Sequence, residues 1–393
     1  MDTNFDYLIV GAGLSGIVLA ERISTQLNKT SIIIDKRNHI GGNCYDEYDE
    51  CGLLVHTYGP HYFRTNSDRI VQHISQFTNW KNAKYNVRSY TDGKYWSFPI
   101  NLHTYEQLIG RKSTEHEFIE YLSKSKVPIE NPKNSEEVII SQVGYELFEK
   151  FFRGYTRKQW KMEPKELDAS VCGRIPIRTN YDDRYFSDKF QALPSEGYTK
   201  MFEKMLRAAK HAKVLLSTDY REIKKFIKFK HIIFTGAIDE YYNYTFGRLP
   251  YRSLRFERES FNPSQLKARS SISNSINFWQ PSLQVNYPND HDYTRIIELK
   301  HVTKQQSDHT TIVREYPMDY NLDSIPYYPV PTPSSQLLYQ KYLERSKIEK
   351  NVSFVGRLAT YKYYNMDQVI GMALTEFDKL QTNARNHMPS IQL

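Results

Sequence analysis

Residues 5–16 read FDYLIVGAGLSG, an apolar run that leads into glycines at positions 11, 13 and 16. We predict a strand over Phe5–Val10, a helix over Leu14–Leu27 and a second apolar strand over Ser31–Asp35. In such a unit the glycines permit a tight turn, let a pyrophosphate approach the backbone and let the helix pack closely on the strand. Asp35 ends the second strand, where its carboxylate can accept hydrogen bonds from ribose hydroxyls. This stretch therefore predicts a dinucleotide-binding site.

The identity of the dinucleotide depends on the residues that follow. Lys36 and Arg37 would suit a 2′-phosphate, but Asp35 beside them would repel one. Gly41-Gly42-Asn43 resembles the second glycine pair of FAD proteins of the glutathione reductase type, and no second G-x-G-x-x-G is present for NAD(P)H. We therefore expect FAD, contacted in this region by Gly11, Gly13, Leu14, Ser15, Gly16, Asp35, Lys36, Gly42 and Asn43.

Two later segments return to the pattern of a buried strand that ends at a glycine. They read HIIFTG at residues 231–236 and NVSFVG at residues 351–356, and a helix is predicted from Asp367. We assign both to the same domain, which is then discontinuous and comprises residues 1–80, 200–247 and 340–393. The lysine-rich run at 224–230 is interpreted as an exposed connection, and the tail after about Gln381 as disordered.

The remaining residues predict two further lobes. Over 103–170 charged and apolar residues mix at intervals of three and four, as in ELFEKFF at 146–152, which indicates a helical lobe. Residues 81–102, 171–199 and 248–339 form the other lobe, where short Tyr-, Ile-, Val- and Thr-rich segments between turn residues predict antiparallel strands. The expected fold class is α/β: a Rossmann-like FAD-binding domain with a helical lobe and an antiparallel β-sheet lobe.

Composition narrows the function classes. The 393 residues carry a net charge of +8, but the basic residues are dispersed and no nucleic-acid recognition motif accompanies them, so we expect no nucleic-acid partner. No stretch is apolar enough to span a membrane, and no signal peptide is evident, so no membrane partner is expected. Cys44, Cys51 and Cys172 form no Cys-x-x-Cys pair, which favours a cytoplasmic location. The histidine spacing indicates no metal site.

A longer series of motifs carries a resemblance to one family. Residues 56–66, HTYGPHYFRTN, are similar to the Gly-Pro-His-x-Phe-His-Thr segment of UDP-galactopyranose mutases. The likeness continues, in the family's order and over nearly the whole chain, at residues 155–160, 174–178, 180–186, 238–242, 249–254, 293–296 and 356–367. This resemblance implies an isomerase that interconverts UDP-galactopyranose and UDP-galactofuranose.

The resemblance also implies how such an enzyme works. The FAD is active when reduced, and its N5 forms a covalent bond to the sugar while UDP leaves and returns, without net oxidation. The partners implied are a UDP-sugar substrate, an external reductant and a second copy of the chain in a homodimer, with a product used for cell-surface polysaccharides.

Residue roles follow from the same motifs. Arg174, Arg295 and His61 are the implied catalytic residues: the two arginines contact the diphosphate, and His61 lies near the flavin. The implied substrate-binding residues are Arg64, Phe151, Phe152, Tyr155, Trp160, Arg174, Tyr185, Arg295, Tyr328 and Tyr363. Further cofactor contacts are implied at His56, Gly356, Arg357, Tyr364, Met366 and Asp367.

One position departs from the family pattern, because Arg64 stands where the family usually has a second histidine. A longer, permanently charged side chain could remodel the sugar pocket and allow an N-acetyl group at the sugar 2-position; the alternative is an unchanged substrate. Two other functions are weighed. An FAD-dependent oxidoreductase of the amine-oxidase kind would share the glycine motif, and an inactive nucleotide-sugar binder would be expected to lack some of the arginines or glycines named above.

Overall fold

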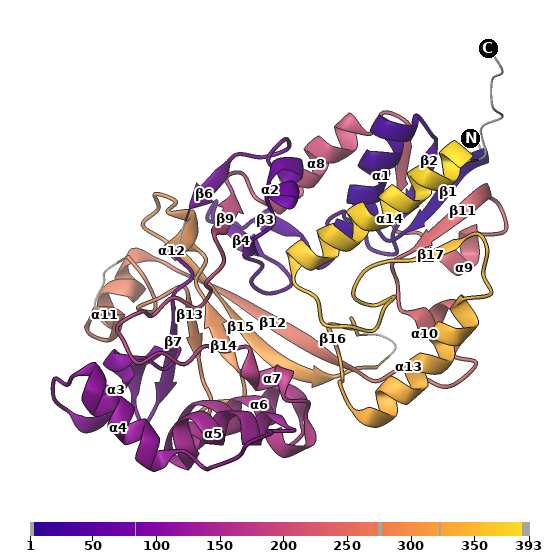
Figure 1. The fold of residues 1–393 in the computed structure, drawn as a ribbon. Coiled ribbons are helices and arrows are strands. Elements are labelled where there is room, and N and C mark those ends of the chain that lie inside the picture. The colour runs from indigo at the N-terminus through magenta and orange to yellow at the C-terminus, as the bar shows by residue number, and fades with distance from the viewer. Residues whose placement is uncertain (1–3, 83, 274–276, 322–323, 387–393) are drawn as a thin grey trace.

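The computed structural model describes residues 4–82, 84–273, 277–321 and 324–386. A five-stranded parallel sheet lies near both described ends of the chain (Figure 1). Its strand order is β10 (Ala212–Leu215), β2 (Ser31–Ile34), β1 (Asn4–Val10), β11 (Lys228–Phe234) and β17 (Val352–Phe354). The apolar segments of β1, β2 and β11 are buried because helices cover the sheet, as expected for parallel strands.

Three helices dominate the cover of this sheet. Helix α1 spans Leu14–Leu27, as predicted, and packs against α8 (Tyr198–Ala208) and α14 (Met366–Asn386). It ends at Asn28, whose left-handed φ of 51° closes the last turn. Shorter helices accompany this domain: α2 (Asp68–Ile74), α9 (Tyr220–Ile223), α10 (Ile238–Tyr241), α13 (Pro333–Ser346) and the 3₁₀ turn η1 (Gly42–Cys44).

Two boundary predictions in this domain were wrong. Strand β11 begins at Lys228, inside the lysine-rich run that was interpreted as a connection, because its first residues pair with β1 while alternate side chains stay exposed. Helix α14 continues to Asn386, beyond the predicted start of disorder at about Gln381. Residues 387–393 of that tail lie outside the described residues.

The helical lobe lies at the opposite end of the molecule from the parallel sheet (Figure 1). Its helices are α3 (Leu102–Ile109), α4 (Glu115–Ser125), α5 (Ser135–Phe148), the π-helical turn η2 (Glu149–Arg153), α6 (Gly154–Trp160), the 3₁₀ turn η3 (Pro164–Glu166) and α7 (Ser170–Gly173). Asn101, Thr114 and Asn134 cap α3, α4 and α5 by accepting backbone N–H bonds in the first turn. Helix α5 therefore has a well-defined N-terminus, and the chain continues from it directly into η2 and α6 in the interior.

A seven-stranded sheet lies between these two parts (Figure 1). Its order is β16 (Tyr328–Pro329), β12 (Tyr251–Phe261), β15 (Thr310–Asp319), β14 (Arg295–Ile297), β13 (Gln284–Asn286), β7 (Val87–Thr91) and β8 (Lys94–Phe98). All neighbouring pairs are antiparallel except β13 and β7. Within the region predicted as strands, Pro263–Ser273 instead forms helix α11 and Lys300–Thr303 forms α12. The fold class, α/β with a Rossmann-like domain, is confirmed by the parallel sheet and its helices.

Two small sheets connect the parts. One pairs β3 (Asp46–Tyr48) with β4 (Leu54–His56), and the other has the order β5 (Phe63–Thr65), β9 (Phe190–Pro194) and β6 (Trp80–Asn82). Strand β5 thereby holds Arg64 next to the segment that ends at β9, in register with Gln191.

Substitutions at two glycines of the first turn are expected to destabilise the protein by different amounts. A Cβ at Gly16 would lie 2.0 Å from the Gly11 carbonyl oxygen and 3.1 Å from Ile9 Cγ2, whereas a Cβ at Gly13 would meet only Gly42 Cα, at 3.7 Å. We expect Gly16→Ala to lower the free energy of unfolding by about 1–3 kcal/mol, the usual cost of overpacking, and Gly13→Ala to cost less than about 1 kcal/mol. Urea unfolding of protein freed of bound small molecules measures both; equal losses would contradict the packing argument.

Candidate active site

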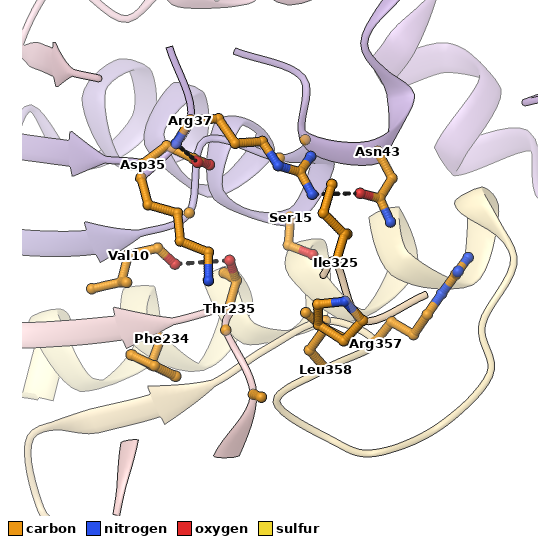
Figure 2. A pocket seen from close by; sticks show the side chains of 18 of the residues that line it. Val10, Ser15, Asp35, Arg37, Asn43, Phe234, Thr235, Ile325, Arg357 and Leu358 are labelled. Carbon is orange, nitrogen blue, oxygen red and sulfur yellow. Dashed lines mark hydrogen bonds between the residues drawn. The ribbon is translucent and has the colours of Figure 1, made fainter. Parts of the chain in front are cut away.

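Three neighbouring cavities, which share lining residues, run from the parallel sheet toward the helical lobe. The first has a volume of about 500 Å³ and lies over the carboxyl ends of β1, β2 and β11 (Figure 2). Of the predicted cofactor contacts, those that line it are Gly11, Gly13, Leu14, Ser15, Asp35, Lys36, Gly42, Asn43, Gly356, Arg357 and Met366. Chain segments more than 300 residues apart in sequence therefore meet at one cavity.

The glycine turn offers backbone donors to this cavity. Gly11 has a φ of +110°, and a Cβ there would lie 2.0 Å from Thr235 Oγ1. Gly13 caps α1 without any side-chain hydrogen bond, so the first N–H groups of the helix are left for another acceptor. A phosphate is the acceptor that a helix N-terminus favours, because both the N–H groups and the helix dipole attract negative charge.

Asp35 and Arg37 shape the next part of the wall (Figure 2). Asp35 accepts the Ala12 N–H through Oδ2 at 2.8 Å and the Arg37 N–H through Oδ1 at 2.9 Å, so its carboxylate is held in place. The Arg37 guanidinium donates to Asn43 Oδ1 at 2.8 Å and lies 4.6 Å from the Tyr58 ring centre. The sequence interpretation left Arg37 out of the site, although it adjoins Lys36.

The second cavity, of about 280 Å³, opens from the first. Both are lined by Asn43, Tyr58, His61, Arg357 and Met366. Of the predicted catalytic and substrate-binding residues, those that line the second cavity are His61, Arg64, Arg174, Tyr185, Arg295, Tyr328 and Tyr363. The predicted sugar and diphosphate contacts therefore converge beside the predicted cofactor site.

Arg295 is the more tightly held of the two predicted diphosphate contacts. Its Nε and Nη2 donate to Glu315 Oε2 at 2.9 and 2.7 Å. Burial alone would lower the pKa of Arg295, but the Glu315 carboxylate raises it, so the guanidinium stays charged. Glu315 Oε1 is buried and has no hydrogen-bond partner among the described residues. Sequence reasoning did not find Glu315, because β15 brings it to Arg295 only through the sheet register.

Arg174 reaches the same place from the end of α7. Its guanidinium lies 4.9 Å from the Tyr363 ring centre, and the Arg357 guanidinium lies 5.1 Å from the same ring. Burial would raise the pKa of Tyr363, but the charges of Arg174 and Arg357 lower it to about 8. Three guanidiniums around a small polar cavity suit an anionic ligand.

The third cavity, of about 80 Å³, shares Arg174, Tyr185, Arg295, Tyr328 and Tyr363 with the second. It is narrow and aromatic, and the predicted residues that line it from η2 and α6 are Phe151, Phe152, Tyr155 and Trp160. Gln159 also lines it, and both polar atoms of its buried amide lack a hydrogen-bond partner among the described residues. A flat ligand with both donors and acceptors, such as a pyrimidine base, would satisfy them.

Lys158 ties α6 to the loop that precedes Arg295. Its ammonium, with three N–H donors, lies within hydrogen-bond distance of the backbone carbonyl oxygens of Tyr287, Asp290, His291 and Tyr293. The helix that carries Tyr155 and Trp160 is thereby fixed relative to the strand that carries Arg295.

His61 lies at the boundary of the first two cavities as an uncharged side chain. Its Nδ1 lies 2.9 Å from the Gly59 carbonyl oxygen, which can only accept, so in the neutral ring the hydrogen is on Nδ1 and the lone pair on Nε2. Burial lowers the pKa of His61 to about 3. It can therefore accept a hydrogen bond at neutral pH but is not a proton donor there.

Four predicted cofactor contacts do not line the first cavity: Gly16, His56, Tyr364 and Asp367. Gly16 faces the Gly11 carbonyl inside the turn, and His56 lies behind the cavity wall, where its Nδ1 accepts the His61 N–H. Tyr364 acts through its backbone, whose carbonyl accepts from Arg357 at 2.9 Å. The sequence motifs placed these residues near the site, but a motif does not show in which direction each side chain points.

Arg64 is held against the wall of the second cavity. Its Nη1 donates to Asp188 Oδ2 at 2.7 Å, and the guanidinium lies 4.2 Å from the Phe186 ring centre. Asp188 and Phe186 line the same cavity. The arginine that departs from the family pattern is thus a fixed planar group rather than a freely moving charge.

Membrane-spanning helices and metal-binding clusters are two features that would bear on function. In the part of the chain that the structure describes, no helix combines the length and the apolar character needed to cross a bilayer. Among the same residues, no group of three or more His, Cys, Asp or Glu side chains is arranged to hold a metal ion.

Comparison with known proteins agrees with the geometry. The family model for UDP-galactopyranose mutase matches residues 150–363, and that for an NAD(P)-binding Rossmann-like domain matches residues 9–77. A probable UDP-galactopyranose mutase of Klebsiella pneumoniae is 37% identical over 98% of this chain and 96% of its own. A dTDP-fucopyranose mutase of Escherichia coli is 36% identical over 93% and 96%, and a UDP-galactopyranose mutase of Mycoplasma genitalium is 32% identical over 96% and 95%.

Solved structures show the same fold. A reduced UDP-galactopyranose mutase superimposes with a TM-score of 0.74 over 96% of this chain and 94% of its own, at 15% sequence identity. Putrescine oxidase bound to putrescine gives a TM-score of 0.57 at 12% identity over 96% and 99% of the two chains, a likeness of fold alone. From the family model and the near full-length relatives, we conclude that this chain belongs to the UDP-galactopyranose mutase family.

Proposed function

We propose that this protein interconverts UDP-galactopyranose and UDP-galactofuranose and is active when its bound FAD is reduced. The observation that carries the proposal is the convergence of Arg174 and Arg295 at the junction of the second and third cavities. A UDP-sugar whose diphosphate lies at this junction would direct its base into the aromatic third cavity and its sugar toward the first. Family membership supports the same assignment.

The residues around the first cavity fit FAD. The uncapped N-terminus of α1 suits the pyrophosphate, and the fixed Asp35 carboxylate retains lone pairs for a ribose. When bound and reduced, the flavin would supply a nucleophile that takes the sugar from UDP and later returns it. The protein then has to bind, orient and stabilise charge rather than make bonds itself.

The arginines stabilise the charge that develops on departing UDP. Forked guanidinium donors in a partly buried site interact strongly with a diphosphate, and Glu315 holds Arg295 in the orientation needed. Tyr185, Tyr328 and Tyr363 enclose the same junction and help to exclude water, which would otherwise hydrolyse a separated sugar. His61 contributes a hydrogen-bond acceptor toward the boundary with the cofactor.

A second candidate substrate follows from one relative. Because a 36% identical protein is named a dTDP-fucopyranose mutase, a thymidine nucleotide of a 6-deoxy sugar has to be tested beside UDP-galactose. Thymine and uracil present the same amide edge to Gln159 and differ by a methyl group. The substrate comparison below therefore includes both nucleotides.

Arg64 leads us to propose a wider sugar preference. Its guanidinium is fixed by Asp188 and Phe186 along the cavity wall, where its remaining N–H groups can donate to the carbonyl of an acetamido group. We propose that UDP-N-acetylgalactosamine is accepted as well. We further propose a cytoplasmic homodimer that receives electrons from an external reductant; the helical lobe leaves Ile119 and Tyr145 exposed for such contacts.

The activity test uses purified protein with UDP-galactofuranose or dTDP-fucofuranose, with and without dithionite, and follows the pyranose by chromatography. We expect a yellow protein that isomerises UDP-galactofuranose only after reduction. Arg174→Ala and Arg295→Ala should each lower kcat about 10²–10³-fold, because each removes a donor from the developing charge. Arg153→Ala, which removes an exposed arginine paired with Glu149 and Glu163, should stay within about twofold. Reduction of the oxidised flavin by the added sugar nucleotide, without isomerisation, would favour an amine-oxidase-like activity.

The sugar preference is tested by competing UDP-galactose with UDP-N-acetylgalactosamine on wild type and Arg64→His. We expect the variant to lose about tenfold in kcat/KM for the N-acetyl sugar relative to galactose, since one charge-assisted hydrogen bond is lost. Arg69→His is the matched control, because Arg69 forms an exposed ion pair with Asp378. An unchanged ratio in Arg64→His would remove the role proposed for Arg64.

A further inference from the structure

The backbone of residues 59–61 forms a wall shared by the cofactor and sugar cavities. His61 lines both cavities. Gly59 has a φ of +85°, and a Cβ there would lie 3.1 Å from the Phe256 ring and 3.3 Å from Glu315 Oε2, the oxygen that holds Arg295. A shift of this segment would therefore move the cofactor wall and press on the Arg295 support together.

One buried side chain holds this segment from behind. The His61 backbone N–H donates to His56 Nδ1 at 3.0 Å. A backbone N–H can only donate, so Nδ1 must carry the lone pair and Nε2 the hydrogen. His56 Nε2 lies 4.0 Å from Asp46 Oδ2, its cross-strand neighbour in the β3–β4 pair. The His61 N–H thus selects the tautomer of an imidazole that is only 5% exposed, and its Nε2 hydrogen faces the Asp46 carboxylate.

Asp46 is itself anchored to the start of α8. Its Oδ2 accepts the Tyr198 N–H at 2.6 Å and its Oδ1 accepts the Thr199 N–H at 2.8 Å. Gly197 precedes them with a φ of +91°, and a Cβ at this position would lie 2.7 Å from Asp46 Oδ2. The helix N-terminus, the carboxylate, the imidazole and the His61 amide form one continuous chain of contacts.

The imidazole keeps its acceptor under ordinary conditions. Burial lowers the pKa of His56 to about 3, so the ring is neutral and Nδ1 remains unprotonated at neutral pH. A charged ring would carry hydrogen on both nitrogens and would lose the bond to His61.

We propose that His56 is a positioning residue, which fixes the Gly59–His61 backbone at the wall between the cofactor and sugar cavities through its Nδ1 acceptor. Its consequence for the flavin rests on the proposed function. The motif comparison places His56 in contact with the cofactor, whereas the structure assigns it a role exerted through the His61 amide.

The test compares three substitutions that differ in where they place an acceptor. The Asn side-chain oxygen can occupy the place of Nδ1, the Gln oxygen reaches the place of Nε2, and Leu offers no acceptor. The first readout is hydrogen–deuterium exchange of the peptide covering residues 57–63, in protein with and without FAD. We expect exchange to be about tenfold faster in His56→Leu and His56→Gln, and near the wild-type rate in His56→Asn.

The second readout is the flavin itself. His56→Leu and His56→Gln should shift the flavin absorbance bands and lower kcat about tenfold with KM within about twofold, because the sugar still binds but is misplaced. His56→Asn should restore both. His73→Leu is the control, since His73 is an equally buried histidine, 3.7 Å from Glu21, that lines neither cavity.

The outcomes separate this proposal from the proposed function. Unchanged exchange at 57–63 in His56→Leu and His56→Gln, or no difference between Asn and Gln, overturns the role of His56. If His56→Leu does not fold, the Asn and Gln pair decides alone. Wild-type protein that takes up no flavin contradicts the proposed function, while the exchange rates without FAD still decide whether His56 holds the segment.

Discussion

The positive charge of Arg174 and of the partly buried Arg295 is the constraint on which the rest of the site depends. A guanidinium removed from water costs several kcal/mol unless it is paired and hydrogen-bonded. Glu315 pairs with Arg295 through two donors, and Arg174 rests on the Tyr363 ring. The two arginines come from different lobes, one from the end of α7 and the other from β14, so they meet only when the helical lobe and the seven-stranded sheet are assembled.

Charge changes along the three cavities in a way that matches a sugar nucleotide beside a flavin. The aromatic third cavity contains the unpaired amide of Gln159, and the junction with the second contains the cations. At the boundary with the first cavity, His61 and the His56 behind it are uncharged, because burial lowers the pKa of both. Arg174 and Arg295 therefore place positive charge where a diphosphate would lie, while the neutral His61 and the cationic Arg357 both line the boundary with the cofactor cavity. Under the proposed function, the two arginines would stabilise the departing UDP, and His61 would present an acceptor rather than a proton to the flavin.

Sequence reasoning succeeded where the signal was local. The glycine turn and the approximate bounds of α1 were predicted, because the spacing of glycines and apolar side chains there reflects contacts within one strand–helix unit. It failed for the start of β11, whose alternating lysines resemble an exposed loop although the backbone pairs with β1. It also failed for α11, since Pro263–Ser273 has a weak helical pattern inside a region of strands. In both cases backbone pairing or neighbouring elements outweighed side-chain pattern.

The sequence by itself determined the Rossmann-like class and the positions of the glycines, because both are set by residue type and spacing within a short segment. The list of candidate arginines and aromatic residues came from the resemblance of short motifs to one family. Only the tertiary structure decided which side chains meet. It paired Glu315 with Arg295 across β14 and β15, fixed Arg64 on Asp188, and turned His56 away from the cofactor cavity toward the His61 amide. Strand register, helix termini and side-chain direction set these contacts, and they depend on residues that are far apart in the chain and meet only after folding.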